Sequence, residues 1–419
     1  MSTTPTDYVH LSHLGAAYVC EESSFCTPGT PVRCHPVADS LEAIATQETV
    51  ENRALSPIAF DARTPIAGDK SGTVKLAYYL APAATVMLAG ATPPTDEEAP
   101  FRPMLRCLMG GESCLAGSAV VTGTSESSID VTSGHGSRFL PGQLLAVNSG
   151  VAGFELVQSR SRSTDTIGMY PDLSDAPSTG ADVQNLLTYY VTNANSRSLS
   201  LGFSPGSNTD RQYLFKGCTG GLGLKFERSQ LAQMELTLTA ATFTGPEALG
   251  MAVTRSEDPL APPLSVRNLT VWLQPCATTT RLNTSIDTLA LTINTGMSHL
   301  TSLTGTTEGK RGTIRSEGLI DSFATWELVM PDCPEVYTWH AAGTELCAAA
   351  IAQVAEGDGR RFVAVMSPQC VIASRPEPMK GDKNQSKVKV MLRAKISEQC
   401  SGTGSTSEMA RSPLVIGLG

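Results

Sequence analysis

Charged and aromatic residues are scarce in this sequence, at 17% and 5% of its 419 residues. Basic residues are concentrated only in SRSR at 159–162 and in a group of lysines near 387–395, and the net charge is −9. A protein that wraps nucleic acid through its phosphates normally carries a basic stripe, so the composition disfavours that function. It is compatible with a surface that repels DNA and lets it slide past.

The sequence also lacks a long apolar run and a secretory leader. No stretch reaches the about 18 apolar residues of a membrane span, and MSTTPTDYVHLSHLG has neither a basic start nor an apolar core. The 11 cysteines are an odd number and too dilute for a disulfide scaffold. We therefore expect no membrane association, a reducing compartment and mostly buried thiols.

Motifs for cofactor binding are missing as well. The glycine cluster in YLFKGCTGGLGLKFERSQLAQMELTLTAATFTG (213–245) is followed by period-two alternation and not by a helix, which argues against a phosphate-binding loop. We expect a long hairpin over 222–243 with the polar turn ERSQLAQ. The glycines are interpreted as turn residues at the end of an aromatic strand: Gly217, Gly220, Gly221 and Gly223.

Candidate catalytic groups and metal ligands are not suitably spaced. Cys20, Cys26, Cys34 and His35 share one segment but lack the close CxxC pair that zinc sites use. Paired carboxylates such as those at 97–98 lie in polar loops. We expect no catalytic residue, no cofactor and no metal, and interpret the chain as a non-enzyme.

Threonine, glycine and alternating apolar positions favour a mainly β fold. Two helices are expected: one in EEAPFRPMLRCLMGG, with acidic residues at its start and Gly110 at its end, and one in GTELCAAAIAQVAEG, from an N-cap at Thr344 to a stop at Gly357. Strands are expected at GTVKLAYYLAP, LLTYYVTNANSRSLSLGF, VRNLTVWLQP, DTLALTINT, FATWELVMP, RRFVAVMSP and SKVKVMLRAKIS.

The last of these strands has two chemically different faces. Alternate apolar residues from Val388 to Ile396 are expected to be buried, whereas the face with Lys387, Lys389, Arg393 and Lys395 is cationic. That cationic face could bind an acidic partner or nucleic acid. It could equally be an exposed sheet face, an edge protected by lysines, or the surface that meets an acidic neighbour in an assembly.

The elements predict a multidomain organisation. The insertion in the first domain is either a small β-barrel or an elaborated loop region, because turn signals recur every few residues there. The expected parts are an N-terminal arm or extended loop at 1–60, a first β domain at 61–245 with a small β insertion at about 115–190, a Pro-rich linker at 246–265, a second β domain at 266–400 and a C-terminal tail at 401–419.

An internal repeat links the two domains. Residues 63–82 and 311–331 each run from an arginine through a polar loop into a strand that ends in proline. A predicted helix follows each, then an aromatic-led strand with a cysteine (QYLFKGC, RFVAVMSPQC) and a long alternating strand. The pattern predicts a duplicated unit; the alternative is that this order recurs by chance in a β-rich chain.

Three blocks together resemble the tail tube (major tail) proteins of long-tailed bacteriophages. They are RQYLFKGCTGGLGLKFERSQLAQMELTLTAATFTG, ARTPIAGDKSGTVKLAYYLAP…FRPMLRCLMGG and FLPGQLLAVNSGVAGFELV…MYPDLSDAPSTGADV, and the resemblance covers about 55–400. It implies two tail-tube-like β-sandwich or barrel domains in tandem, each with a flanking helix. Rings of such subunits would stack into a hollow tube.

The resemblance also implies the partners of the chain. It would associate with itself, as trimeric pseudo-hexameric rings if the repeat is real and as hexameric rings if it is not. Other tail proteins, such as the tape measure and the terminator, would contact it, and genomic DNA would pass through the lumen without specific binding. The expected location is the virion tail, after assembly in the host cytoplasm.

Two alternative functions stay open. A tail-tip, terminator or baseplate protein would form a single ring instead of a stack. A β-rich virion binding module would present exposed aromatic residues, and only Trp272, Trp326 and Trp339 are available as tryptophans. Trp272 and Trp326 fall in predicted strands, where core packing is expected.

Overall fold

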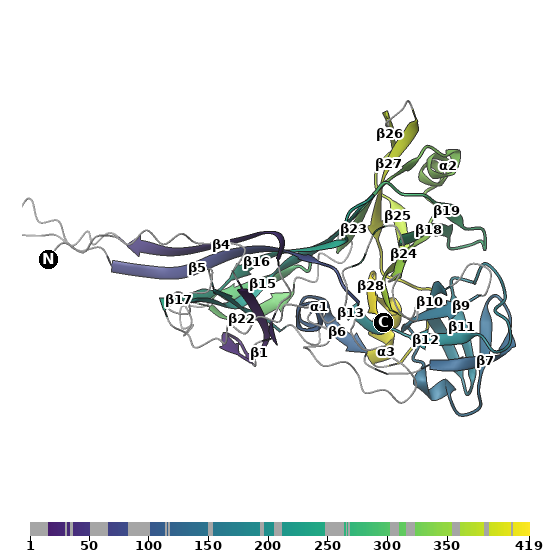
Figure 1. Ribbon diagram of the computed structural model, residues 1–419, viewed down its shortest axis with the longest axis horizontal. Coiled ribbons are helices and arrows are strands. Elements are labelled where there is room, and N and C mark those ends of the chain that lie inside the picture. Colours follow the sequence, from purple (N-terminus) through teal and green to yellow (C-terminus); the bar gives the residue numbers. More distant parts are fainter. Residues whose placement is uncertain are drawn as a thin grey trace, which may run out of the picture.

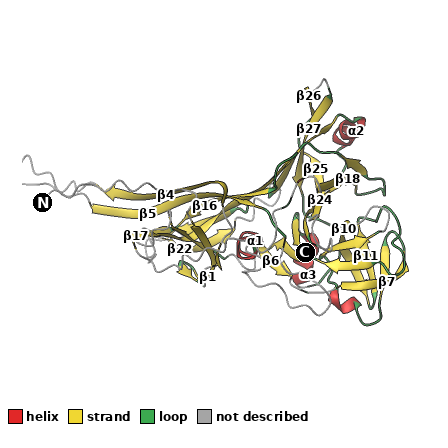
Figure 2. Cartoon of the chain, in the orientation of Figure 1, coloured by secondary structure: helices red, strands yellow, loops and turns green. Residues whose placement is uncertain are grey.

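The architecture is that of a computed structural model (Figure 1). Over the described residues the protein is mainly β with large antiparallel sheets, as the sequence predicts (Figure 2). The described residues are 16–29, 32–33, 37–50, 66–82, 101–113, 115, 118–149, 154–192, 197–204, 212–247, 264, 266, 269–301, 310–315, 323–353, 361–380, 385–403 and 405–419.

A long antiparallel sheet, here called the spine sheet, runs through the molecule. It contains most of the strands that the sequence predicts. In spatial order its strands are β4 (Val37–Val50), β5 (Ile66–Tyr79), β16 (Gln233–Ala240), β15 (Gln212–Glu227), β20 (Thr288–Ile293), β23 (Ala324–Pro331), β27 (Ser386–Ala394), and β25 (Phe362–Ile372) with its continuation β26 (Glu377–Lys380).

Two of these strands, β15 and β25, leave the spine sheet and enter a second layer of strands. The first part of β15 pairs with β14 (Leu199–Ser204) and β17 (Thr242–Glu247), and β14 pairs with β1 (Ala16–Ser24), which also meets β2 (Thr27–Pro28) and β3 (Val32–Arg33). The first part of β25 pairs with β24 (Leu346–Gln353) and β28 (Val415–Leu418). Beyond them lie β18 (Leu269–Pro275), β19 (Leu282–Thr284), β13 (Leu187–Val191) and β6 (Gly110–Ser113).

The same strand order therefore occurs twice. In the first half β4, β5, β16 and β15 lie side by side, and in the second half β20, β23, β27 and β25 do. In both halves the last of these strands bends into the second layer, where it pairs with the strand that precedes it in sequence, β14 or β24. The two halves meet where β15 pairs with β20.

Alternation explains why these residues form a sheet with one buried face. In β16 the side chains of Met234, Leu236 and Leu238 are buried, and those of Glu235 and Thr237 are exposed. Burying a leucine of this kind stabilises the fold by about 1.5–3 kcal/mol. One apolar cluster contains residues from the spine sheet and from the second layer of both halves, so the two halves share a continuous core.

The short strands predicted within 115–192 close into a small barrel with its own apolar core, at the lower right of Figure 1. Of the two alternatives for this region, the β-barrel is correct. Its strands are β7 (Ser118–Thr124), β8 (Ser128–Val131), β9 (Leu144–Asn148), β10 (Phe154–Ser163), β11 (Thr166–Tyr170) and β12 (Asp182–Asn185), and a separate ribbon consists of β21 (Met297–Thr301) and β22 (Lys310–Arg315).

The helices agree with the sequence in one case and not in the other. The first is α1 (Arg102–Met109), which ends at Gly110 in the left-handed conformation, as predicted. The acidic residues expected at its start lie outside the described residues. The second helix is not at 344–357: the structure has α2 (Pro334–Ala342) just before it, and Gly343 is its left-handed C-terminal residue.

The alanine-rich segment after α2 is a strand, β24, and the prediction of a helix there is wrong. All residues from Leu346 to Ala352 are buried. They pair with β18 on one side and β25 on the other. A strand covered on both faces reads as a continuous apolar run, which periodicity alone cannot distinguish from a buried helix.

Both ends of the chain also differ from the prediction. Residues expected to form an N-terminal arm or loop include β1 and the long strand β4, both of them paired in sheets. The expected C-terminal tail forms α3 (Ser405–Arg411) and β28, whose four residues are buried between β13 and β25. Sheet pairing with distant strands, invisible in local sequence, decides both cases.

Three smaller expectations need comment. Most of the predicted linker at 246–265 lies outside the described residues, but its first two residues end β17 and Leu264 is buried in the core. Ile396, predicted to be buried in the last strand, follows the end of β27 and is exposed. The glycines of 217–223 are not in a turn, because β15 runs through them without interruption.

Candidate assembly interface

At the junction between the halves, β15 and β20 are paired directly as neighbouring strands of one sheet. The register of this pairing places Leu222 opposite Ile293 and Phe226 opposite Leu289. All four side chains are at most 3% exposed, so an apolar surface covers the backbone ladder. Where the ladder ends, the Thr295 hydroxyl donates a hydrogen bond to the Gly220 carbonyl.

The two outer edges of the spine sheet are open among the described residues. β4 pairs only with β5, and β26 pairs only with β27. Both edges carry an exposed apolar side chain, Ile44 on β4 (49% exposed) and Met379 on β26 (43%). Long open edges are templates for pairing with another chain, which makes these two strands the candidate interface.

Glycine geometry explains how β15 serves two sheets. Gly217 has φ +64°, and a Cβ there would lie 2.7–2.9 Å from Ala241, Cys26 and Phe25. The strand can therefore bend from the second layer into the spine sheet only with glycine at this position. The hairpin predicted over 222–243 is present: residues Thr219 to Lys225 of β15 pair with β16, and the polar turn follows Glu227.

The outward face of the spine sheet carries charges that balance. On this face the acidic residues are Glu42, Glu227, Glu235, Glu327 and Glu377, and the basic residues are Lys75, Lys225, Lys387, Lys389 and Arg393. Several of them form ion pairs, such as Lys75 with Glu42 at 3.0 Å and Lys225 with Glu227 at 2.8 Å. The chain has a net charge of −9, but among the described residues of this face neither sign is in excess.

The cationic face of β27 is part of that balance. Lys389 pairs with Glu327 at 2.8 Å, Lys387 with Asp287 at 2.6 Å, and Lys395, just beyond the strand, with Glu345 at 2.6 Å. The hydrogen bond that the Lys389 ammonium donates to the Glu327 carboxylate raises the pKa of Lys389. β27 lies between β23 and β26, so the interpretation as a lysine-protected edge is wrong; the lysines meet acidic neighbours within the chain.

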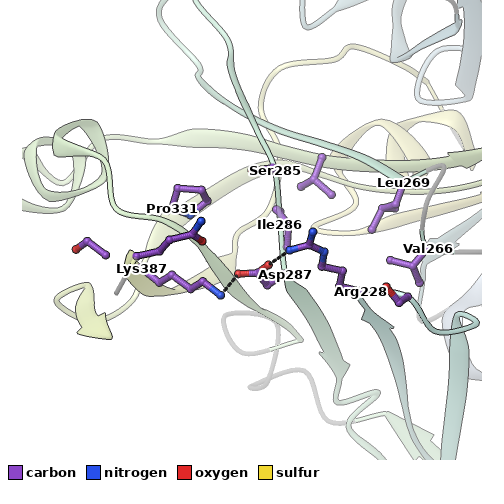
Figure 3. Close-up of a pocket in the computed structure, with 12 residues that line it drawn as sticks. Arg228, Val266, Leu269, Ser285, Ile286, Asp287, Pro331 and Lys387 are labelled. Carbon is purple, nitrogen blue, oxygen red and sulfur yellow. Dashed lines mark ion pairs between the residues drawn. The ribbon is translucent and has the colours of Figure 1, made fainter. Parts of the chain in front are cut away.

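A pocket of about 840 Å³ opens at one end of the β15–β20 junction (Figure 3). The turn of the β15–β16 hairpin contributes Arg228, and the segment before β20 contributes Asp287. Asp287 lies between two cations, 2.6 Å from the Lys387 ammonium and 3.6 Å from the Arg228 guanidinium. One ion pair, Arg228–Asp287, thus joins the hairpin turn to the second half of the chain, although the Arg228 side chain is largely exposed. The Arg228 backbone N–H also donates a hydrogen bond to the Asp287 carbonyl.

Several of the described thiols lie in two groups, one with Cys276, Cys347, Cys370 and Cys400 and one with Cys20, Cys26 and Cys218. Burial raises the pKa of Cys20 to about 11, which makes it a poor nucleophile and a poor metal ligand. Cys34 and His35 lie outside the described residues, and within the described ranges no three His, Cys, Asp or Glu residues are grouped as metal ligands would be. Trp272 and Trp326 are buried, as predicted, and Trp339 on α2 packs against the core.

Comparison with known proteins adds no family. No protein-family model matches the chain, and no curated protein matches it either. None of the helices in the described part of the chain is long and apolar enough to cross a membrane.

The sequence predicts the strands next to the candidate interface but neither of its two edges, β4 and β26. The long strands β5, β15, β16 and β27 carry regular alternation and were predicted. β4 was missed because the apolar and polar residues of VADSLEAIATQETV show no regular alternation. The side chains at 44–48 are all exposed, so no buried face imposes an apolar residue at every second position. The other edge, β26, is only four residues long.

Proposed function

We propose that the chain is a structural subunit of a bacteriophage tail tube, which polymerises as stacked rings around a lumen for DNA. The observation that carries the proposal is the doubled strand order, open at both ends. A sheet with two open edges and one charged face is suited to closing into a large barrel with identical neighbours. The two halves would be the tandem tube-like domains, each with a flanking helix, α1 or α2.

The doubled order favours trimeric rings with pseudo-sixfold symmetry over hexamers. Each chain offers eight strand positions, from β4 to β25–β26. Three copies would give about 24 strands; at about 4.8 Å spacing and about 40° tilt, opposite walls are about 48 Å apart. Side chains narrow that width, but a barrel of this size leaves a wide channel.

The charged face of the spine sheet would line this channel. The opposite face of the sheet is buried in the core, so only the charged face is available to the lumen. Because its acidic and basic residues balance, it has no strong attraction for phosphates and would let DNA pass without specific binding. The barrel at 118–185 would lie outside the tube wall as a decoration.

Electron microscopy of purified protein tests this proposal. Long hollow tubes are the expected result. Single rings under all conditions would favour the alternative, a tail-tip, terminator or baseplate ring protein. Protein that stays monomeric at high concentration would contradict both.

The tip of the β15–β16 hairpin is the expected axial contact. Arg228 to Leu231 are all exposed, whereas Ala232 is buried and donates a backbone hydrogen bond to Leu264. Replacing Arg228 and Leu231 by serine changes only side chains and leaves that backbone hydrogen bond in place, whereas deleting the whole turn, 227–233, would remove it. We expect folded protein that no longer forms tubes. Ile314→Ser, at a similarly exposed apolar side chain on β22, is the matched control and should polymerise normally.

A further inference from the structure

The internal junction of the chain is a template for the contact between two copies. The two halves align where β15 and β25 bend. Leu199 pairs with Cys218 and Leu201 with Phe215, as Leu346 pairs with Cys370 and Ala348 with Ser367, and both pairings contain the same one-residue irregularity. Cys218 therefore corresponds to Cys370 and, across the sheet, Gly72 of β5 corresponds to Ala324 of β23. This alignment carries over to the remaining strands of each half, because every pair has a defined register.

The register then assigns equivalent positions to the open edges. Ile44 lies opposite Thr73 on β5, as Thr292 lies opposite Thr325 on β23, so Ile44 corresponds to Thr292. On the other edge, Glu377 pairs with Lys389 on β27, as Gly223 pairs with Glu235 on β16. Glu377 therefore corresponds to Gly223.

We propose that β4 of one copy pairs antiparallel with the end of β25 and with β26 of a second copy, in the register of the internal β15–β20 ladder. Gly223 is directly opposite Thr292 in that ladder. In the contact between copies, Glu377 of one copy therefore lies opposite Ile44 of the other. The inference deepens the proposed function and rests on it, because it specifies how the ring closes.

The sides of the strands are consistent with this pairing. At Cys370, β24 and β27 lie on opposite edges of β25. At Cys218 and Thr219, β14 and β16 likewise lie on opposite edges of β15, and β20 continues on the β14 edge. The edge of β25–β26 that would receive β4 is the edge on which β24 pairs with β25 up to Cys370. After Cys370 this edge is open among the described residues.

A second observation points to a neighbouring copy. β4 and β5 continue beyond the spine sheet as a two-stranded ribbon, at the left of Figure 1. The β4 side chains at 46–48 in this ribbon are exposed, whereas on β5 the Lys70 ammonium lies 5.5 Å from the ring centroid of Phe243 on β17. A two-stranded ribbon with so little support from other strands is only marginally stable by itself. Pairing of the adjoining part of β4 with a second copy would anchor it.

Cross-linking between different copies tests the register. Ile44→Cys and Glu377→Cys are made as separate variants, mixed under assembly conditions and oxidised, so that a disulfide between the two new cysteines can form only between two molecules. We expect a dimer band at least tenfold stronger than in oxidised wild type. Thr237→Cys, exposed on the same face but in the interior of the sheet, replaces Ile44→Cys in the control and should give no increase.

Microscopy of the same samples separates the two claims. Tubes or rings without the Ile44–Glu377 cross-link overturn the inferred pairing and leave the proposed function standing. Cross-linked dimers that never form rings support the pairing and contradict the proposed function. Amide exchange of 377–380 gives an independent readout: it should slow at least tenfold on assembly, and unchanged exchange overturns the pairing.

Discussion

Two glycines in β15 provide a matched pair of substitutions with opposite expected effects. A Cβ at Gly220 would lie 2.0 Å from the Thr237 carbonyl oxygen, whereas a Cβ at Gly223 would have its nearest contact at 3.6 Å, with the Leu291 carbonyl oxygen. Neither glycine has a positive φ, so the difference is one of space. The Thr237 oxygen belongs to the β15–β16 ladder and can move only if the two strands separate.

Gly220→Ala should therefore destabilise the chain by about 3 kcal/mol, as overpacking against fixed backbone does. Gly223→Ala should stabilise it by about 0.5 kcal/mol, because alanine reduces the freedom of the unfolded chain. The difference of about 3.5 kcal/mol is roughly a 300-fold change in the folding equilibrium. Urea unfolding of unassembled protein, followed by tryptophan fluorescence, measures both variants. Equal midpoints would refute the continuous strand and favour a turn at these glycines.

Three other predictions concern buried polar groups. Arg315→Met should cost about 3 kcal/mol or more in urea unfolding, because the guanidinium donates to the carbonyls of Leu108, Met109 and Thr192; wild-type stability would contradict these contacts. Burial lowers the pKa of His299 below 6.5 in the folded protein. The neutral imidazole therefore contributes its full stability above pH 6.5, and this contribution is lost as the pH falls through the pKa of the folded state. The urea midpoint should drop between pH 7 and 5 more in wild type than in His299→Gln. Burial raises the pKa of the Cys107, Cys218 and Cys347 thiols, so they should react with a thiol reagent at pH 8 only after unfolding, and rapid labelling of native protein would disprove their burial.

The sequence predicts best where one face of a strand is buried and the other is exposed. β16 and β27 show this alternation residue by residue, and both were located correctly. The prediction fails for β24, where Leu346 to Ala352 are buried on both faces and alanine favours a helix by intrinsic propensity. Contacts with β18 and β25 overrule that propensity, and they are distant in the sequence.

The helix α2 illustrates a signal that was present and outweighed. Pro334 stands at its first turn and Gly343 directly after its end, which is the usual placement of these residues. The apolar run that follows, between an expected N-cap at Thr344 and a stop at Gly357, favoured a helix further on. For the candidate interface, only the pairing of strands from distant segments locates the open edges, since neither β4 nor β26 has a distinctive local pattern.

The central claim is that copies of this chain close a barrel by pairing β4 with the end of β25 and β26. Electron cryomicroscopy of the assembled protein measures this directly. The account predicts a hollow tube of stacked threefold rings with pseudo-sixfold walls, in which a continuous sheet passes from one copy to the next. Sixfold rings in which each copy supplies only one half to the wall, or an assembly with no continuous sheet around its lumen, would contradict it.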